Sequence, residues 1–268
     1  RNGARIAVGA NNHNNGEGQV IAYTLDQDSQ WEQTGAALVG ARFGARFGNA
    51  VSLSGDGNIL AVGSPDFISY STAGLIKGYA SVYQWDADAI KWQQYGNEFL
   101  SLSSSDKFGH DVSLSDNGSQ LAVGALSFVN GNYRSGAVSM FQYGSKIPFE
   151  NDPNPDDDWH QIGENLVGIP SQNQQFGSSV ALGANGRHVI VGALNLNFAK
   201  TRVHVYRWNG QMWDTTDALE GGVNEEFGWD VDITTNDDGR LTFIVAAGPV
   251  TSFAGGKDGV ARVYEWKD

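Results

Sequence analysis

Cysteine is absent from this chain of 268 residues. Its absence excludes disulfide bonds and thiolate metal sites, but a repeat core of this size can fold without them, so the compartment stays open on this ground. Positive charge is scarce as well: 17 Lys and Arg residues stand against 30 Asp and Glu residues, a formal net charge of −13. Nucleic acids and anionic membranes attract basic surfaces, so neither is expected as a partner.

Long apolar runs are also missing. The longest, around Phe243 to Val250, is far too short to cross a bilayer, so we expect no direct membrane insertion. Proline is rare at 6 residues and glycine abundant at 35, a balance typical of short strands joined by tight turns. Because no Pro-rich or low-complexity linker interrupts the chain, residues 1–268 are expected to form a single domain.

Three segments recur along the chain. The first recurs four times, as FGNAVSLSGDGNILAVGSP (47–65), FGHDVSLSDNGSQLAVGA (108–125), FGSSVALGANGRHVIVGA (176–193) and FGWDVDITTNDDGRLTFIVAAGP (227–249). The second recurs five times, as GQVIAYTL (18–25), GYASVYQW (78–85), GAVSMFQY (136–143), TRVHVYRW (201–208) and GVARVYEW (259–266). The third recurs four times, as WEQTGAALVG (31–40), WQQYGNEFLS (92–101), WHQIGENLVG (159–168) and WDTTDALEGG (213–222). Their Val, Ile, Tyr and Trp content, bounded by turn residues, predicts strands.

The first segment contains an Asp-Gly or Asn-Gly pair that predicts a tight hairpin, so it supplies two strands and one unit has four, A to D. The sequence therefore predicts an all-β fold, a β-propeller of four-stranded antiparallel blades with five repeats present. The opening RNGARIAVGA (1–10) matches only the second half of the first segment. The first blade should thus lack strand A and the last, ending at Asp268, strand D. We therefore expect a fragment of a longer chain, with open blade edges that favour self-association or a larger assembly.

The Phe-Gly and Gly-Ala-Pro-like signatures resemble the FG-GAP repeats of integrin α-subunit propellers, and are most similar to those of secreted algal, protist and bacterial FG-GAP proteins. The resemblance covers essentially the whole chain and implies an extracellular or cell-surface location. Integrin-type repeats often carry an Asp-rich calcium loop between strands A and B. Here that connection is a tight turn with too few carboxylates for six or more oxygen ligands, so we expect no metal there. These turns lie at Asp56, Asn117, Asn185 and Asp238.

Loops on one face of a propeller, between strands B and C and between strands D and A, most often bind ligands. The B–C loops here are long and variable, and together with two residues of strand A they carry aromatic, amide and carboxylate groups suited to a glycan or a protein partner. The predicted ligand-binding residues are Asn12, His13, Asp66, Tyr70, His110, Tyr133, Trp229 and Asp258. The alternative is that the aromatic side chains only pack under their own loops.

Strand A lines the central channel, and Asp111 and Asp230 occupy equivalent positions in two blades, with Asp232 two residues further on. Five-bladed glycosidases use inner-strand carboxylates as acid and as nucleophile or base, so these three residues are the candidate catalytic set. The alternative is that they are hydrated acids of a solvated channel. A complete catalytic constellation is not visible in the sequence.

An acidic insertion at 150–158 could wrap a calcium ion through Asp152, Asp156, Asp157 and Asp158, although such a run is more often a solvated loop. No other cofactor is expected. Asn117 is the asparagine of the only glycosylation sequon. The repeated Phe-Gly pairs and the tryptophans that open the third segments are given structural roles, the former between blades and the latter at the rim.

Taken together, these features favour a non-catalytic extracellular propeller for binding, adhesion or scaffolding, with a glycan or protein bound on the B–C and D–A loop face. On this interpretation the chain is not an enzyme. The alternative is a carbohydrate-active hydrolase that uses the channel-lining carboxylates Asp111, Asp230 and Asp232.

Overall fold

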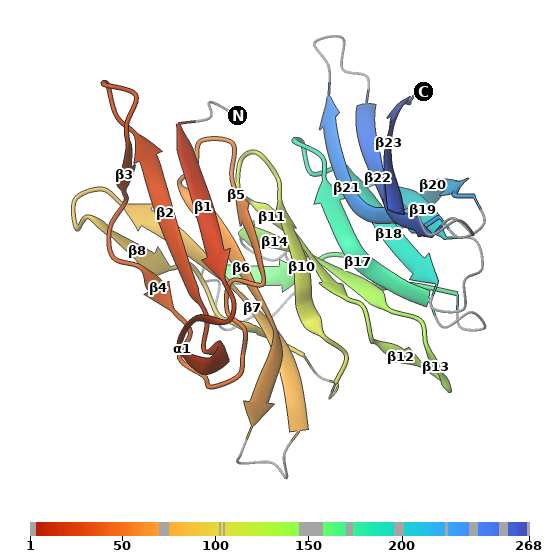
Figure 1. Ribbon diagram of the computed structural model, residues 1–268, viewed down its shortest axis with the longest axis horizontal. Coiled ribbons are helices and arrows are strands. Elements are labelled where there is room, and N and C mark those ends of the chain that lie inside the picture. The colour runs from red at the N-terminus through yellow and green to blue at the C-terminus, as the bar shows by residue number, and fades with distance from the viewer. Residues whose placement is uncertain are drawn as a thin grey trace.

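The computed structural model describes residues 4–69, 75–101, 103, 105–144, 158–169, 174–195, 201–222, 225–235, 241–251 and 257–266. In this part the chain forms antiparallel sheets placed side by side (Figure 1). A single short helix, α1 (His13–Gly16), lies among them, and it contains left-handed backbone at Asn14 and Asn15. The all-β prediction is confirmed.

Five sheets correspond to the five predicted repeats. The first consists of β1 (Arg5–Ala10), β2 (Gln19–Leu25), β3 (Trp31–Gln33) and β4 (Leu38–Val39). The second consists of β5 (Ala50–Leu53), β6 (Ile59–Ser69), β7 (Leu75–Asp86), β8 (Lys91–Gln94) and β9 (Phe99–Leu100). The third consists of β10 (Phe108–Leu114), β11 (Gln120–Ala125), β14 (Ala137–Gly144), β15 (Asp158–Gln161) and β16 (Leu166–Val167), with the hairpin of β12 (Val129–Asn130) and β13 (Tyr133–Arg134) beside it. The fourth consists of β17 (Gln174–Leu182), β18 (His188–Asn195), β19 (Arg202–Trp208) and β20 (Trp213–Glu220), and the fifth of β21 (Phe227–Thr235), β22 (Leu241–Thr251) and β23 (Lys257–Glu265).

The strand order within each sheet is that of a propeller blade, A-B-C-D along the chain. In the first three sheets the predicted strand D is divided into two short strands that both pair with strand C. Among the described residues the first sheet holds no strand A and the fifth no strand D, as the repeat alignment predicted. The innermost strands β5, β10, β17 and β21 follow one another across the molecule (Figure 1).

Strand B of each middle blade is buried on both faces, because a neighbouring blade covers each side. Leu60, Ala61 and Val62 in β6 are fully buried, and the corresponding residues of β11 and β18 are buried in the same way. A strand covered on both faces needs a continuous apolar run, and the small alanine in β6 lets the adjacent blade come close. The LAVG and VIVG sequences therefore identify the sandwiched strands.

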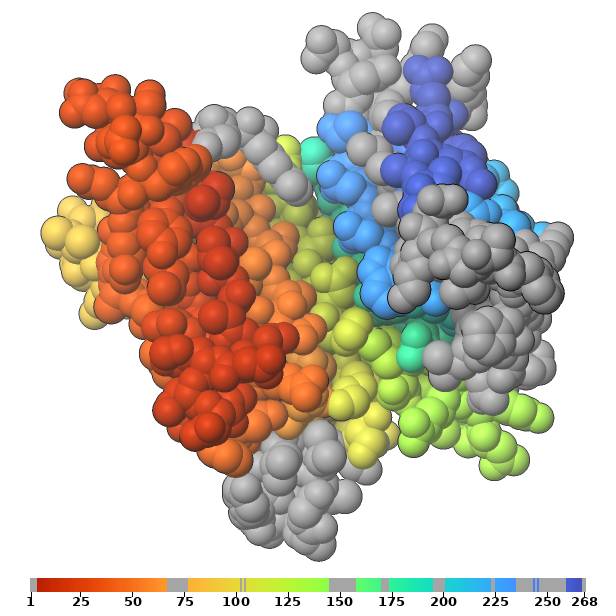
Figure 2. All heavy atoms as spheres, in the orientation of Figure 1, coloured from red at the N-terminus to blue at the C-terminus, as the bar shows by residue number. Residues whose placement is uncertain are grey.

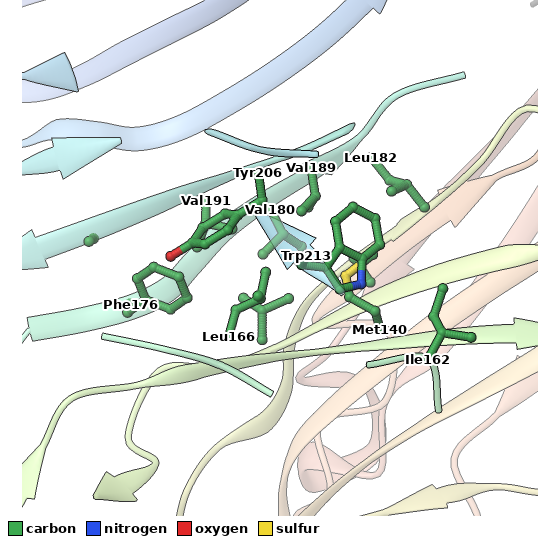
Figure 3. Packing of buried hydrophobic residues seen from close by; sticks show 13 residues of the cluster. Met140, Ile162, Leu166, Phe176, Val180, Leu182, Val189, Val191, Tyr206 and Trp213 are labelled. Atoms are coloured by element: carbon green, nitrogen blue, oxygen red, sulfur yellow. The ribbon is translucent and has the colours of Figure 1, made fainter. Parts of the chain in front are cut away.

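The phenylalanine of every Phe-Gly pair is buried between two blades, as predicted. Each belongs to a cluster formed with the preceding blade: Phe47, Phe108, Phe176 and Phe227. In the cluster around Phe176, Met140 and Leu166 of the third blade meet Val191 and Trp213 of the fourth (Figure 3). The core of the molecule therefore lies between the blades.

The glycine of each pair lies in close backbone contact with the preceding blade. Its φ lies between 82° and 86° in all four repeats, a conformation that favours glycine. Its carbonyl oxygen lies against a glycine in strand B of the preceding blade, where a Cβ atom would overlap it. The four glycine pairs are Gly9 with Gly48, Gly63 with Gly109, Gly124 with Gly177, and Gly192 with Gly228.

Replacing Gly124 by alanine tests this contact. The added Cβ would overlap the carbonyl oxygen of Gly177, so the third and fourth blades must separate. We expect the free energy of unfolding, measured by urea denaturation, to fall by about 1–3 kcal/mol.

Gly183→Ala is the matched control, because its Cβ would meet the carbonyl oxygen of His188 at an ordinary 3.4 Å. It should change stability by less than about 0.5 kcal/mol. Equal effects of the two substitutions would contradict this account of blade packing.

Candidate active site

The Phe-Gly pair produces a β-bulge that sets which side chain follows it on the inner strand. The register of strands A and B shifts between Phe108 and Val112, and at the equivalent places in the fourth and fifth blades. Bulges re-aim side chains and are frequent beside active sites. The second residue after each Phe-Gly pair follows the bulge. In successive blades it is Ala50, Asp111, Ser179 and Asp230.

Asp111 is half-buried on β10, and its carboxylate bridges to the next blade. One oxygen accepts a 2.7 Å hydrogen bond from the backbone N–H of Val180 in β17, and the other accepts one of 2.9 Å from Val112 N–H. Burial raises the pKa of Asp111 to about 7, aided by repulsion from the Asp230 carboxylate and opposed by the two N–H bonds. The group therefore exchanges its proton near neutral pH, as a general acid does.

Asp230 provides the contrasting partner on β21. Its side chain is exposed, and one carboxylate oxygen accepts a 3.0 Å hydrogen bond from Val231 N–H. No further hydrogen bond of this carboxylate is found among the described residues. The preceding Trp229 is 55% exposed, so an indole face stands next to the carboxylate in sequence. Asp232 is also exposed, but it stands at the position of Ser113 rather than of Asp111.

Serine residues at neighbouring positions tie the inner strands together. The hydroxyl oxygen of Ser52 accepts a hydrogen bond from Leu114 N–H at 3.0 Å, and that of Ser113 accepts one from Leu182 N–H at 2.9 Å. Asp111 therefore has a structural role as well, because it joins the same ladder of side-chain bonds between blades. Unlike these serines, Asp111 carries an ionisable group, and this group is half-buried.

The inner strands border a hollow in the molecular surface. In Figure 2 the surface is recessed between the red and orange first two blades and the blue fifth blade, with yellow-green residues of the third blade at its floor. Asp111 and Asp230 belong to β10 and β21, the inner strands of the third and fifth blades, and their charges are close enough to interact. The structure places two of the three predicted catalytic residues on β10 and β21, two inner strands that each contact β17.

A pocket of about 470 Å³ lies on the face formed by the B–C and D–A loops. It contains Asn12 and Asp66, which the sequence had indicated as ligand-binding residues. It also contains residues that sequence reasoning missed: Asn15, Gly16, Gly44, Arg46 and Lys107. Their place in the repeat could have identified the two cations, because Arg46 and Lys107 each directly precede a Phe-Gly pair.

The remaining ligand-binding candidates are dispersed. His13 is exposed at the start of α1, and Tyr133 is exposed on the hairpin of β12 and β13. His110 is half-buried, and burial lowers the pKa of its imidazole, with Asp66 opposing and Lys107 adding to the effect. Tyr70 lies outside the described residues, as does the side chain of Asp258.

The A–B turns use their oxygen atoms internally. Asp56 accepts hydrogen bonds from the Ser54 hydroxyl at 2.6 Å and from Asn58 N–H at 2.9 Å. The side-chain oxygen of Asn117 accepts bonds from Ser115 and Ser119 in the same manner. Asn117 is exposed, and its glycosylation stays a prediction.

The acidic insertion is described only at its last residue. Asp152, Asp156 and Asp157 lie outside the described residues, and the carboxylate of Asp158 accepts hydrogen bonds from Asn97 N–H at 3.1 Å and from Trp159 N–H at 2.7 Å. Within the part of the chain that the structure describes, no group of three or more His, Asp or Glu side chains could hold a metal. A calcium ion in this loop stays a prediction.

Comparison with known proteins identifies a similar structure. Neither a family model nor a curated protein matches the chain. A solved structure of the periplasmic gluconolactonase PpgL from Pseudomonas aeruginosa is similar, with a TM-score of 0.52 and 16% sequence identity. The match covers 97% of this chain and 69% of that one. It supports the assignment of the fold as a β-propeller. In the described part of the chain, no helix has the length and apolar character needed to cross a membrane.

This match corrects the functional interpretation of the sequence. A non-catalytic binding, adhesion or scaffolding module was expected, and the conclusion that the chain is not an enzyme followed from it. The similar protein is a gluconolactonase, an enzyme, and this finding contradicts both statements. The sequence had indicated Asp111, Asp230 and Asp232 as the catalytic set of the alternative, a hydrolase, which ranked second because no complete catalytic constellation was visible.

The protonation of Asp111 can be measured directly. Because its pKa in the folded protein lies above that in the unfolded chain, folding takes up a proton between about pH 4 and pH 7. Stability contributed by this group is therefore greatest at the acidic end, falls as the pH rises through this window and levels off above it. Carbon-detected NMR of the carboxyl groups should show Asp111 titrating near pH 7.

Asp230→Asn should lower the pKa of Asp111, because it removes the repelling charge. Asp217→Asn, at an exposed site on β20, is the control and should leave that titration unchanged. If Asp111 of the unaltered protein titrated near pH 4, about the value of an unperturbed aspartate, this would contradict the half-buried environment described for it.

Proposed function

We propose that this protein is a carbohydrate-active hydrolase whose active site contains Asp111 and Asp230. The observation that carries the proposal is the contrast between the two carboxyl groups. Asp111 is half-buried with its pKa raised to about 7, whereas Asp230 is exposed on the inner strand of another blade. Hydrolases that use two carboxyl groups typically hold them in different environments, one in an apolar site and one in a solvated site.

In the proposed reaction Asp111 is the general acid. In its protonated form, it donates its proton to the oxygen of the departing group as the bond to that oxygen breaks. The Asp230 carboxylate accepts a proton from the attacking water, whose oxygen forms the new bond. The same roles serve a glycosidic bond or the ester bond of a sugar lactone, and the structural similarity to a gluconolactonase supports including the lactone.

The substrate class is supported by Trp229. Its indole is largely exposed directly beside Asp230 in sequence, and exposed aromatic rings next to carboxylates stack on the apolar faces of sugars while the carboxylate binds hydroxyl groups. A glycan is therefore the proposed partner, and Trp229 retains a role in binding it.

We also propose that the repeats are related to the FG-GAP family and that the protein works outside the cytoplasm. The Phe-Gly pairs of the four repeats support the first statement. The structural similarity to a periplasmic enzyme supports the second. Self-association through open blade edges is a further part of this proposal, supported by the repeat pattern.

The test is hydrolysis of a panel of glycosides and sugar lactones by the unaltered chain and its variants. Asp111→Asn and Asp230→Asn should each lower kcat/KM by about 10²- to 10⁴-fold, because each removes a proton-transfer group. The activity of the unaltered protein should fall as the pH rises through about 7, where Asp111 loses its proton.

Asp217→Asn is again the control and should retain full activity, since its carboxylate is exposed on the outer strand β20. Binding without turnover across the whole panel would overturn the proposal, as would unchanged turnover in the Asp111 and Asp230 variants.

A further inference from the structure

The pocket on the loop face is positively charged in a protein that is strongly acidic overall. Among the described residues that line it, the charged ones are two cations, Arg46 and Lys107, and one anion, Asp66. The net charge of the chain is −13, so a local excess of positive charge is contrary to its composition. Clefts lined by one sign of charge concentrate ligands of the opposite sign.

The two cations share a single carboxylate. The Arg46 guanidinium lies 3.1 Å from one oxygen of Asp66, and the Lys107 ammonium pairs with the other. Asp66 is 15% exposed, whereas the side chains of Arg46 and Lys107 are 53% and 36% exposed. One positive charge thus stays without compensation inside this trio, and the cations rather than the carboxylate face the solvent.

The backbone holds both cations in place. Arg46 and Lys107 have left-handed φ values of 55° and 61°, which are uncommon for residues with long side chains. Each carbonyl accepts a hydrogen bond from the residue that follows the Phe-Gly pair: Asn49 N–H at 3.0 Å and His110 N–H at 3.1 Å. Arg46 N–H also donates to the Gly16 carbonyl at 2.8 Å, which fixes it against the loop of the first blade. Strained backbone at a pocket is a reason to examine its function.

Two amides complete the pocket. Asn12 and Asn15 are exposed, and no hydrogen bond ties either side-chain amide to another residue that the structure describes. Amide and guanidinium groups together match the hydroxyl groups and the charged oxygens of an acidic sugar.

The pocket lies at the start of β10, because its residue Lys107 directly precedes this strand. His110 lies close enough to Asp66 and Lys107 to feel both charges, and Asp111 follows it on β10.

We infer that the pocket binds an oxyanion carried by a sugar, a carboxylate or a sulfate ester, through Arg46 and Lys107, with Asn12 and Asn15 contacting hydroxyl groups. This inference rests on the proposed function for its substrate class, and it makes the substrate an acidic glycan.

Binding is tested by calorimetry with the catalytically disabled Asp111→Asn chain, so that turnover does not interfere. The probes are an oligogalacturonate, its methyl ester, a sulfated galactan oligosaccharide and inorganic sulfate. We expect the charged oligosaccharides to bind and the methyl ester to bind about 10- to 100-fold more weakly, because the ester lacks the charge. Affinity for the acid form should fall as salt is added. The two charged oligosaccharides distinguish a carboxylate from a sulfate as the anion.

Arg46→Gln and Lys107→Gln should each remove most of the preference for the acid form over the ester. Lys91→Gln makes the same charge change at an exposed site on β8 and should preserve it. Asp66→Asn should strengthen binding, because it removes the opposing charge. Urea denaturation of each variant verifies that it is folded.

Equal affinity for acid and ester, or absence of binding by any oligosaccharide, would overturn the inference. Binding of inorganic sulfate alone would do so as well. Loss of binding in Asp66→Asn as large as in Arg46→Gln would show that the trio serves only to hold the loops together. If the protein preferred the acid form but the unaltered chain hydrolysed no substrate, the proposed function would be contradicted and the anion site would still be supported.

Discussion

The contact between a strand-B glycine and the carbonyl oxygen of the next Phe-Gly pair sets the geometry of this propeller. A Cβ atom on the strand-B glycine would overlap this oxygen, so the two backbones lie in direct contact with no side chain between them. The same approach drives the phenylalanine into the space between blades, where it is excluded from water. A glycine in one blade and a Phe-Gly pair in the next must therefore occur together, and the sequence repeats both in step.

This constraint also determines where variation is tolerated. The left-handed glycine makes the bulge, and the bulge presents the following residue to the inner strands without altering the contact behind it. That position holds Ala50, Asp111, Ser179 and Asp230 in four blades that otherwise pack alike. The scaffold fixes the spacing of the backbones but leaves this side chain free to vary. It can therefore place two carboxyl groups in different surroundings on the inner strands of two blades.

The fold was predictable because its signals are local and repeated. Turn residues, apolar runs and Phe-Gly pairs identified the strands of all five sheets. The site was predictable only in part, because its properties depend on neighbours from other blades. The raised pKa of Asp111 depends on burial beside the fourth blade and on a charge in the fifth. The cations Arg46 and Lys107 look like ordinary surface residues until the loops bring them to one carboxylate.

The residue directly before each Phe-Gly pair also varies between blades, although the Phe-Gly pair itself does not. This residue is Arg46 and Lys107 in the second and third blades but Gln175 and Glu226 in the fourth and fifth, so at this position positive charge occurs in two neighbouring blades. The inner carboxylates belong to the third and fifth blades. On the proposed function, a ligand that reached from the pocket to the inner strands would meet cations at one end and an acid at the other. An elongated substrate with a charged group apart from its reactive bond would satisfy both ends, whereas a small neutral molecule would use only one.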